Sequence, residues 1–211
     1  ADKVNEALAG GLFIDNGYQL VVSSSCAVAR DRVKLEALYP DVGVYQGNFK
    51  FSGGEFIAEM HLKDNHGRTL KFDEVGSGIG YVLPVLIEAL NPKNKNGMLF
   101  LQQPELHLHP ALQASLSDVL IQAAVDRRIV AETHSEHMIL RALKRIRQTF
   151  NETLLDKDLQ LTHEDVAVNY FEPQLDGSTK IHIIRIAPDG DFIDRWPNGF
   201  FPERDQELFD E

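Results

Sequence analysis

The sequence predicts an α/β protein with an antiparallel β meander, a lobe of parallel strands with flanking helices, and a small C-terminal β annex. Short alternating runs separated by Gly-bearing turns before residue 73 indicate antiparallel strands. Helix and strand patterns alternate through 74–150, which predicts a parallel sheet with right-handed crossovers. Short strands return in 151–211, before an acidic tail. We therefore expect three regions: 1–73, 74–150 and 151–211.

The first region begins with weak patterns and becomes clearer after residue 44. Residues 2–9 are compatible with a short helix, and residues 18–23 are rich in β-forming side chains. Runs 44–51 and 55–63 flank Ser-Gly-Gly, and the second run alternates apolar and polar residues. This pattern predicts a hairpin with one buried face, which residues 68–72 extend into a meander.

The second region alternates two kinds of element. A glycine-rich loop at 75–80 precedes apolar residues at helical spacing up to Leu90, with Pro84 expected near the first turn. Strands are expected at 98–101 and 128–133, where short apolar runs occur. Helices are expected to start at Pro110 and after Thr133. Thr133 and Glu136 have capping-box spacing for the second helix, which should reach about residue 149.

The pattern of the third region predicts a small β annex. Residues 166–171, 180–186 and 191–193 are short β-forming runs separated by Gly- and Asp-bearing turns. The aromatic stretch that follows contains Trp196, Phe200 and Phe201. We interpret these rings as packing the annex onto the protein, with a partner-binding patch as the alternative.

Composition excludes several classes of protein. The 211 residues contain one Cys, which rules out a disulfide scaffold, and no apolar run approaches the length of a membrane span. The net charge of -11 argues against a surface that coats nucleic acid. We therefore expect a soluble, cytoplasmic protein without membrane contact. Because the chain opens at Ala1 directly in helical sequence, we also expect a fragment or a natural split product.

Polar residues follow both expected parallel strands. Because ligands collect beyond the carboxyl ends of such strands, Gln102, Gln103, Glu105 and His134 are expected to share one edge. The glycine loop opens a helix, so its backbone N–H groups could hold a phosphate. A loop that only turns tightly is an equal alternative for this feature taken alone.

The order of these features resembles the second half of an ABC-type ATPase of the RecF, SMC and OLD-like branch. Residues 75–81 look like the signature motif, 98–105 like Walker B, 107–110 like the D-loop region and 132–137 like the switch region. The likeness spans about 70–150 and implies a P-loop NTPase fold. The stretch around Trp196 resembles a C-terminal annex of these ATPases that has no assigned chemistry.

The resemblance implies that ATP and Mg²⁺ bind between two head domains of a homodimer. Gly76, Ser77 and Gly78 would act on the nucleotide of the second head. Further residues toward the nucleotide or the metal would be Gln102, Gln103 and His109, with Gln102 toward Mg²⁺ and His134 toward the γ-phosphate. The implied roles are DNA repair or defence against phage and foreign DNA, with DNA or a nuclease as partner.

Two features depart from the family pattern. No Gly-Lys pair occurs in the chain, so the Walker A motif is absent and would come from an N-terminal half of the protein. Gln102 and Gln103 occupy positions where the family has carboxylates, and an amide cannot act as a general base. Glu105 is the nearest acidic substitute, so Glu105 and His134 are the catalytic candidates. A non-hydrolysing, ATP-dependent interaction module is the competing hypothesis.

Other patterns have ordinary explanations beside functional ones. Residues 51–55 (FSGGE) look like a signature motif, but Glu55 begins an alternating strand, so we reject them. The His and Glu residues near the sheet edge could form the metal site of a hydrolase, with hydrogen bonding by His107 and His109 as the alternative. The basic cluster could contact DNA, although a solvated helix face is the usual explanation; it comprises Arg127, Arg128, Arg141, Lys144, Arg145 and Arg147.

Overall fold

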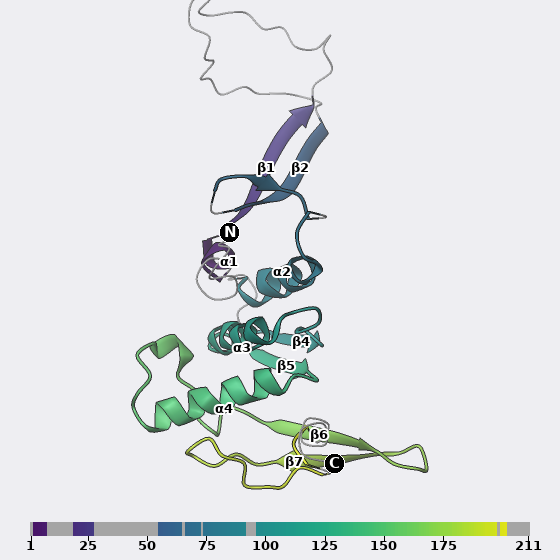
Figure 1. Ribbon diagram of the computed structural model, residues 1–211, viewed down its shortest axis with the longest axis vertical. Helices are drawn as coiled ribbons and strands as arrows, with labels where there is room; N and C mark the ends of the chain where they lie inside the picture. Colours follow the sequence, from purple (N-terminus) through teal and green to yellow (C-terminus); the bar gives the residue numbers. More distant parts are fainter. Residues whose placement is uncertain are drawn as a thin grey trace, which may run out of the picture.

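The computed structural model describes residues 2–7, 19–27, 55–64, 66–72, 74–91, 96–197 and 199–201. The elements follow one another along the long axis of the molecule, with strands β1 and β2 at one end and strands β6 and β7 at the other (Figure 1). Helices α2, α3 and α4 and strands β4 and β5 lie between these ends. No helix in the described ranges is long and apolar enough to span a membrane.

The N-terminal sheet is antiparallel, in the order β1-β2-β3. Helix α1 (Asp2–Ala7) precedes β1 (Gln19–Ala27), which pairs along its whole length with β2 (Glu55–Lys63). The short β3 (Thr69–Leu70) pairs with the end of β2. The antiparallel sheet was predicted, but the long partner of β2 is β1. The predicted strand at 44–51 lies outside the described residues, as do residues 51–54 of the rejected signature-like segment.

The central lobe confirms the predicted α/β fold class. Helix α2 (Ser77–Ala89) leads to β4 (Met98–Gln102), and α3 (Pro110–Ala124) connects β4 to the parallel strand β5 (Arg128–Glu132). Helix α4 (Glu136–Phe150) follows β5. A helix between two strands that pair in parallel is the βαβ unit that the alternating patterns predict.

Two details of the predicted helices were wrong. Ser135 is the N-cap of α4, because its hydroxyl accepts the hydrogen bond of Met138 N–H, whereas the Thr133 hydroxyl accepts from Ser135 N–H. The capping position is therefore two residues later than the capping-box spacing suggested. Helix α2 begins at Ser77, so Pro84 lies in its interior and cannot donate to the carbonyl of Gly80.

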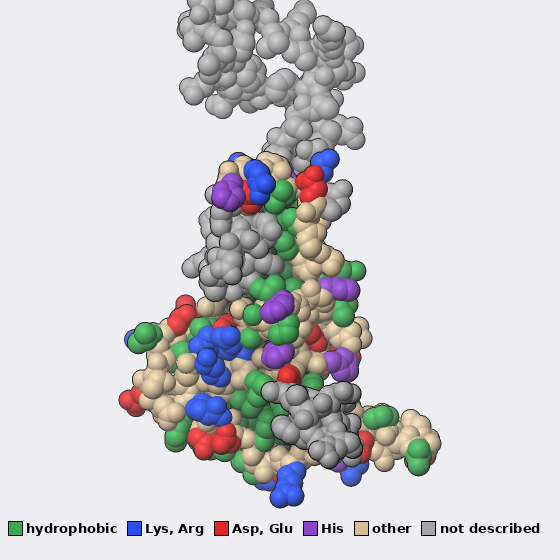
Figure 2. Space-filling model, in the orientation of Figure 1, with side chains coloured by type: hydrophobic (Ala, Val, Ile, Leu, Met, Phe, Trp, Pro, Cys, Tyr) green, Lys and Arg blue, Asp and Glu red, His purple; other side chains and the backbone are tan. Residues whose placement is uncertain are grey.

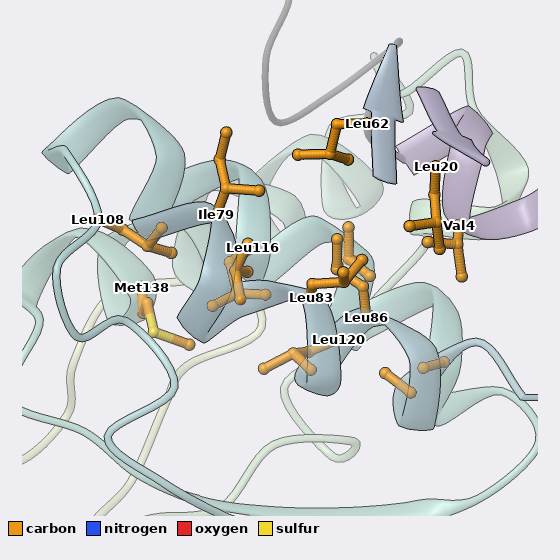
Figure 3. Packing of buried hydrophobic residues seen from close by; sticks show 14 residues of the cluster. Val4, Leu20, Leu62, Ile79, Leu83, Leu86, Leu108, Leu116, Leu120 and Met138 are labelled. Carbon is orange, nitrogen blue, oxygen red and sulfur yellow. The ribbon is translucent and has the colours of Figure 1, made fainter. Parts of the chain in front are cut away.

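The larger hydrophobic core joins the N-terminal elements to the central lobe (Figure 3). Leu62 of β2, Leu86 of α2 and Leu116 of α3 are fully buried in it. Val4 and Leu20 pack at one end of this core and Met138 of α4 at the other (Figure 3). Helix α2 therefore packs between the antiparallel sheet and the βαβ unit.

The annex is a hairpin of β6 (Val168–Pro173) and β7 (Thr179–Ile184), preceded by a 3₁₀ turn at Lys157–Leu159. The predicted strand at 191–193 is reduced to a bridge between Ile186 and Phe192. Trp196 contacts the rings of Tyr170, Phe192 and Phe200 at centroid distances of 5.8, 5.4 and 5.0 Å. These contacts lie within the annex, so packing of the annex onto the rest of the protein stays an interpretation.

Candidate functional site

The carboxyl ends of β4 and β5 bring the predicted polar residues together. Gln102 is paired in register with Glu132, and the backbone N–H of Gln103 donates to the Glu132 carbonyl at 2.9 Å. Glu105 and His134 follow these strand ends and are joined by a hydrogen bond. The four residues predicted to share one edge therefore lie at the ends of two adjacent strands; their catalytic and binding roles stay predictions.

The turn after β4 has an unusual backbone. Gln103 and His107 adopt positive φ angles of 44° and 62°, a region that residues other than glycine seldom occupy. Such conformations cost about 1–3 kcal/mol each and persist only where surrounding contacts enforce them. The segment 103–109, called here the β4–α3 turn, is thus held in a defined shape by its neighbours.

Glu105 connects the β4–α3 turn to the residues after β5. Its side chain is buried, with 7% of the residue exposed, and Oε1 accepts a hydrogen bond from the backbone N–H of His134 at 2.7 Å. The second oxygen, Oε2, is buried and has no hydrogen-bond partner among the described residues. The carboxylate therefore positions the His134 backbone through Oε1, and Oε2 can still accept a hydrogen bond. The His134 residue itself is exposed.

Gln113 makes a second connection between the same two segments. Its Nε2 donates to the Leu108 carbonyl at 2.9 Å, and its Oε1 accepts from the Ser135 hydroxyl at 2.6 Å. A carbonyl can only accept, so the amide group has one consistent orientation. Sequence reasoning missed Gln113, because a glutamine in the first turns of a helix carries no pattern of its own.

The glycine loop lies against the β4–α3 turn. Gly76 and Ser77 are exposed at the N-terminus of α2, and no side chain of the described residues caps this end. The first backbone N–H groups of a helix have no partner within the helix itself. A Cβ atom on Gly78 would lie 2.7 Å from the His107 carbonyl oxygen, so only glycine allows this approach. The rings of Tyr81 and His107 also meet, with centroids 4.6 Å apart.

The histidines near this edge do not assemble into a metal centre. His109 caps α3, since its Nδ1 accepts from Ala111 N–H at 3.3 Å. His137 lies 3.9 Å from its neighbour Glu136. Within the described residues, no three His, Cys, Asp or Glu side chains gather as a metal ion would require. The structure therefore gives no support to the metallohydrolase alternative, and His109 has the structural role considered for it.

Three of the basic residues form ion pairs within the chain. Asp118 of α3 binds both Arg141 and Arg145 of α4 at 3.0 and 2.7 Å, and Arg147 pairs with Asp191. The Asp118 hydrogen bond raises the pKa of Arg145. On the visible face some Lys and Arg side chains lie beside acidic ones, whereas others lie apart from them (Figure 2).

Arg127 has a different role from the rest of the cluster. It is buried, and its guanidinium donates to the carbonyls of Glu88 and Asn91 at the C-terminal end of α2. These bonds satisfy carbonyls that the helix leaves without a partner. Arg127 is therefore a capping residue of α2, and the prediction that it lies on a solvated basic surface was wrong.

One face of the β4–β5 sheet is apolar and exposed. Leu99, Leu101 and Ile129 pack against the core, whereas Phe100 is 70% and Val130 49% exposed on the other face. Met98 is exposed in the same row as Phe100. Parallel sheets in α/β proteins are normally covered on both faces, so this face has the character of a contact surface.

Two models of known protein families match the chain. Residues 13–140 match the family model described as "AAA domain, putative AbiEii toxin, Type IV TA system". Residues 161–210 match a second model, for a protein of unknown function (DUF3696). A comparison with curated protein sequences finds no match.

The chain is also similar in structure to a chain reported under the words "Structural biochemistry of ATP-driven dimerization and DNA stimulated activation of SMC ATPases". The identity is 13% and the TM-score 0.48, with 87% of this chain and 81% of that chain covered.

Proposed function

The chain belongs to the AAA domain family whose description names the AbiEii toxin of type IV toxin–antitoxin systems, and we propose that it forms half of a composite ATP site between two ATPase heads. The family match confirms the predicted resemblance to an ABC- or AAA-type ATPase. The narrower assignment to the OLD-like branch stays a prediction.

The observation that carries this proposal is the meeting of three segments at one edge. The N-terminus of α2, the β4–α3 turn and the segment after β5 are joined by the Gly78–His107 approach, the Glu105–His134 hydrogen bond and the Gln113 bridge. In the predicted motif order these segments are the signature, the Walker B and D-loop region, and the switch region. Their contacts support the proposal that the three segments form one ATP site.

The chemistry of the donors is compatible with nucleotide phosphates. Open N–H groups and the positive dipole end of α2, at Gly76, Ser77 and Gly78, favour an anionic ligand. Gln102 and Gln103 offer amide oxygens, which are neutral ligands for a cation. His134 is exposed next to them and is proposed to contact the γ-phosphate. ATP bound with Mg²⁺ would bring its own phosphate oxygens to complete the coordination of the metal.

We propose that the phosphate-binding loop comes from another part of the complete protein, because these 211 residues contain no Gly-Lys pair. The exposed face of Met98, Phe100 and Val130 supports this, since a covering lobe would bury it. A homodimer would place the α2 N-terminus of one head over the nucleotide of the other.

The biological role that we propose is DNA repair or defence against phage or foreign DNA, with DNA or a nuclease effector as a partner. Any DNA contact would avoid Arg141, Arg145 and Arg147, because ion pairs within the chain already occupy these residues. Arg128 and Lys144, which are exposed, or charges elsewhere in the complete protein would have to supply such a contact.

The test uses the complete protein and measures ATP binding and turnover for Glu105→Gln and His134→Ala. Both substitutions are expected to lower kcat, because one removes a carboxylate and the other the proposed γ-phosphate contact. His66→Ala is the matched control, since His66 lies in an exposed turn between β2 and β3. Turnover equal to that of the control in both variants would refute this assignment.

Gln102 and Gln103 favour the second candidate, a module that binds ATP and dimerises without hydrolysing it. The loss of two carboxylates removes a proton acceptor for the attacking water. ATP-dependent dimerisation, measured by light scattering with no release of phosphate, would support this candidate. Steady turnover by the wild-type protein would exclude it.

A further inference from the structure

Glu132 lies directly beside Gln102, the strand end where this chain lacks the carboxylate of the family pattern. The parallel register pairs Gln102 of β4 with Glu132 of β5, and neighbouring strands lie about 4.8 Å apart. Side chains paired in register project from the same face of a sheet. Both residues are exposed, in the row that continues Phe100 and Val130. The two side chains can therefore reach a common ligand at this edge.

The Glu132 carboxylate is also available. Within the described part of the chain it forms no hydrogen bond or ion pair, and it is exposed at the last position of β5. Glutamate is unfavourable in strands in general, so a strand propensity does not explain its presence here. A solvated surface carboxylate is the ordinary explanation.

Two other acidic residues near this edge are less suited to a metal. Glu105 is buried, and one of its oxygens is held by His134 N–H. Glu136 begins α4, two residues beyond His134, and its carboxylate lies 3.9 Å from the His137 ring. Mg²⁺ sites that hold nucleotides typically use one or two protein carboxylates together with substrate phosphates and water. One exposed carboxylate beside an amide oxygen meets this requirement.

We propose that Glu132 supplies the carboxylate toward Mg²⁺–ATP that Gln102 lacks, so that the negative charge has moved from β4 to the neighbouring strand. This inference rests on the proposed ATP site and adds a residue to it. The local charge is then the same as that of one carboxylate at position 102. Gln102 keeps a role as a neutral oxygen ligand beside Glu132.

The test measures binding of Mn²⁺, a paramagnetic substitute for Mg²⁺, to the complete protein with a non-hydrolysable ATP analogue, using electron paramagnetic resonance. Glu132→Gln is expected to weaken Mn²⁺ binding about tenfold or more, the range that ligand-supporting residues typically contribute. The double variant Gln102→Asp with Glu132→Gln should recover most of this loss, because it returns the charge to β4. Glu164→Gln, at an exposed position outside this edge, is the matched control.

Two results would overturn the inference. Mn²⁺ binding by Glu132→Gln equal to that of Glu164→Gln would mean that Glu132 is a solvated surface carboxylate only. If the double variant does not recover Mn²⁺ binding although its thermal unfolding is unchanged, a negative charge at this edge does not contribute to metal binding. Binding of a fluorescent ATP analogue without metal distinguishes failure of the proposed function from failure of the inference about Glu132. If the wild-type protein does not bind it, the proposed function fails together with the inference; if it binds and the metal result is negative, only the inference fails.

Discussion

The carboxylate of Glu105 accepts a hydrogen bond from the backbone N–H of His134 at 2.7 Å, although 29 residues separate the two in sequence. The bond joins the turn after β4 to the segment after β5. Glu105 is buried, and its second oxygen has no partner in the part of the chain that the structure describes, so packing and this bond chiefly hold the carboxylate in place. The position of the predicted switch histidine therefore depends on an acid in the preceding loop.

Glu105→Ala should release the backbone of His134. The expected result is amide hydrogen exchange at His134 that is about tenfold faster or more, with a loss of about 1–3 kcal/mol in the free energy of unfolding. Glu105→Gln keeps an acceptor oxygen and should retain most of the protection. Hydrogen exchange followed by NMR, with chemical denaturation in parallel, measures both effects. Equal protection in wild type and Glu105→Ala would contradict a positioning role.

Gln113→Glu should break one half of the Gln113 bridge and leave the other. A carboxylate can accept from the Ser135 hydroxyl but cannot donate to the Leu108 carbonyl. We expect a loss of about 1–3 kcal/mol in stability, because the carbonyl loses its donor and faces a negative charge. Gln122→Glu, the same change at an exposed position of α3, is the control. Urea unfolding that is identical for the two variants would show that the bridge contributes nothing.

Gly78→Ala should displace the β4–α3 turn. The added Cβ atom would lie 2.7 Å from the His107 carbonyl oxygen, and a backbone atom cannot move away cheaply. We expect destabilisation of about 1–3 kcal/mol, as for other overpacked sites. Gly80→Ala meets nothing within 4 Å and should instead stabilise α2 by about 0.5–1 kcal/mol. Opposite signs in thermal unfolding of the two variants would confirm the prediction, whereas stabilisation by both would contradict it.

Much of the central lobe could be predicted from sequence because its signals are local. Apolar runs at 98–101 and 128–133 and the helical spacing after Pro110 lead to β4, β5 and α3 within one or two residues. The meeting of Gln102, Gln103, Glu105 and His134 at one edge followed from the rule that parallel strands end together. These predictions needed only the type and order of the elements.

The remainder depends on register and on long-range contacts. The partner of β2 could not be read from the pattern, since a nearer run at 44–51 competes with β1 for the same role. The position of Glu132 beside Gln102 could not be predicted, because it depends on the register of β4 with β5. Arg127 looked like a surface cation, and its burial against α2 depends on a contact across 36 to 39 residues. Such relationships arise from tertiary packing, which local periodicity does not contain.

Asp194 should make the annex sensitive to acid. Arg185 donates three hydrogen bonds to its carboxylate, from the backbone N–H, Nε and Nη2, and the side-chain bonds are the main cause that lowers the pKa of Asp194 to about 2 from an ordinary 3.8. A depressed folded-state pKa stabilises the fold above the unfolded value, and this contribution is lost as the pH falls from about 4 toward 2. Asp194→Asn should therefore unfold with a weaker dependence on pH in that window.

The measurement is tryptophan fluorescence of Trp196 during acid titration, because this ring packs in the annex beside Tyr170. Asp189→Asn, at an exposed turn position, is the control, and an acid transition of Asp194→Asn that matches this control would disprove the contribution of the Arg185 pair.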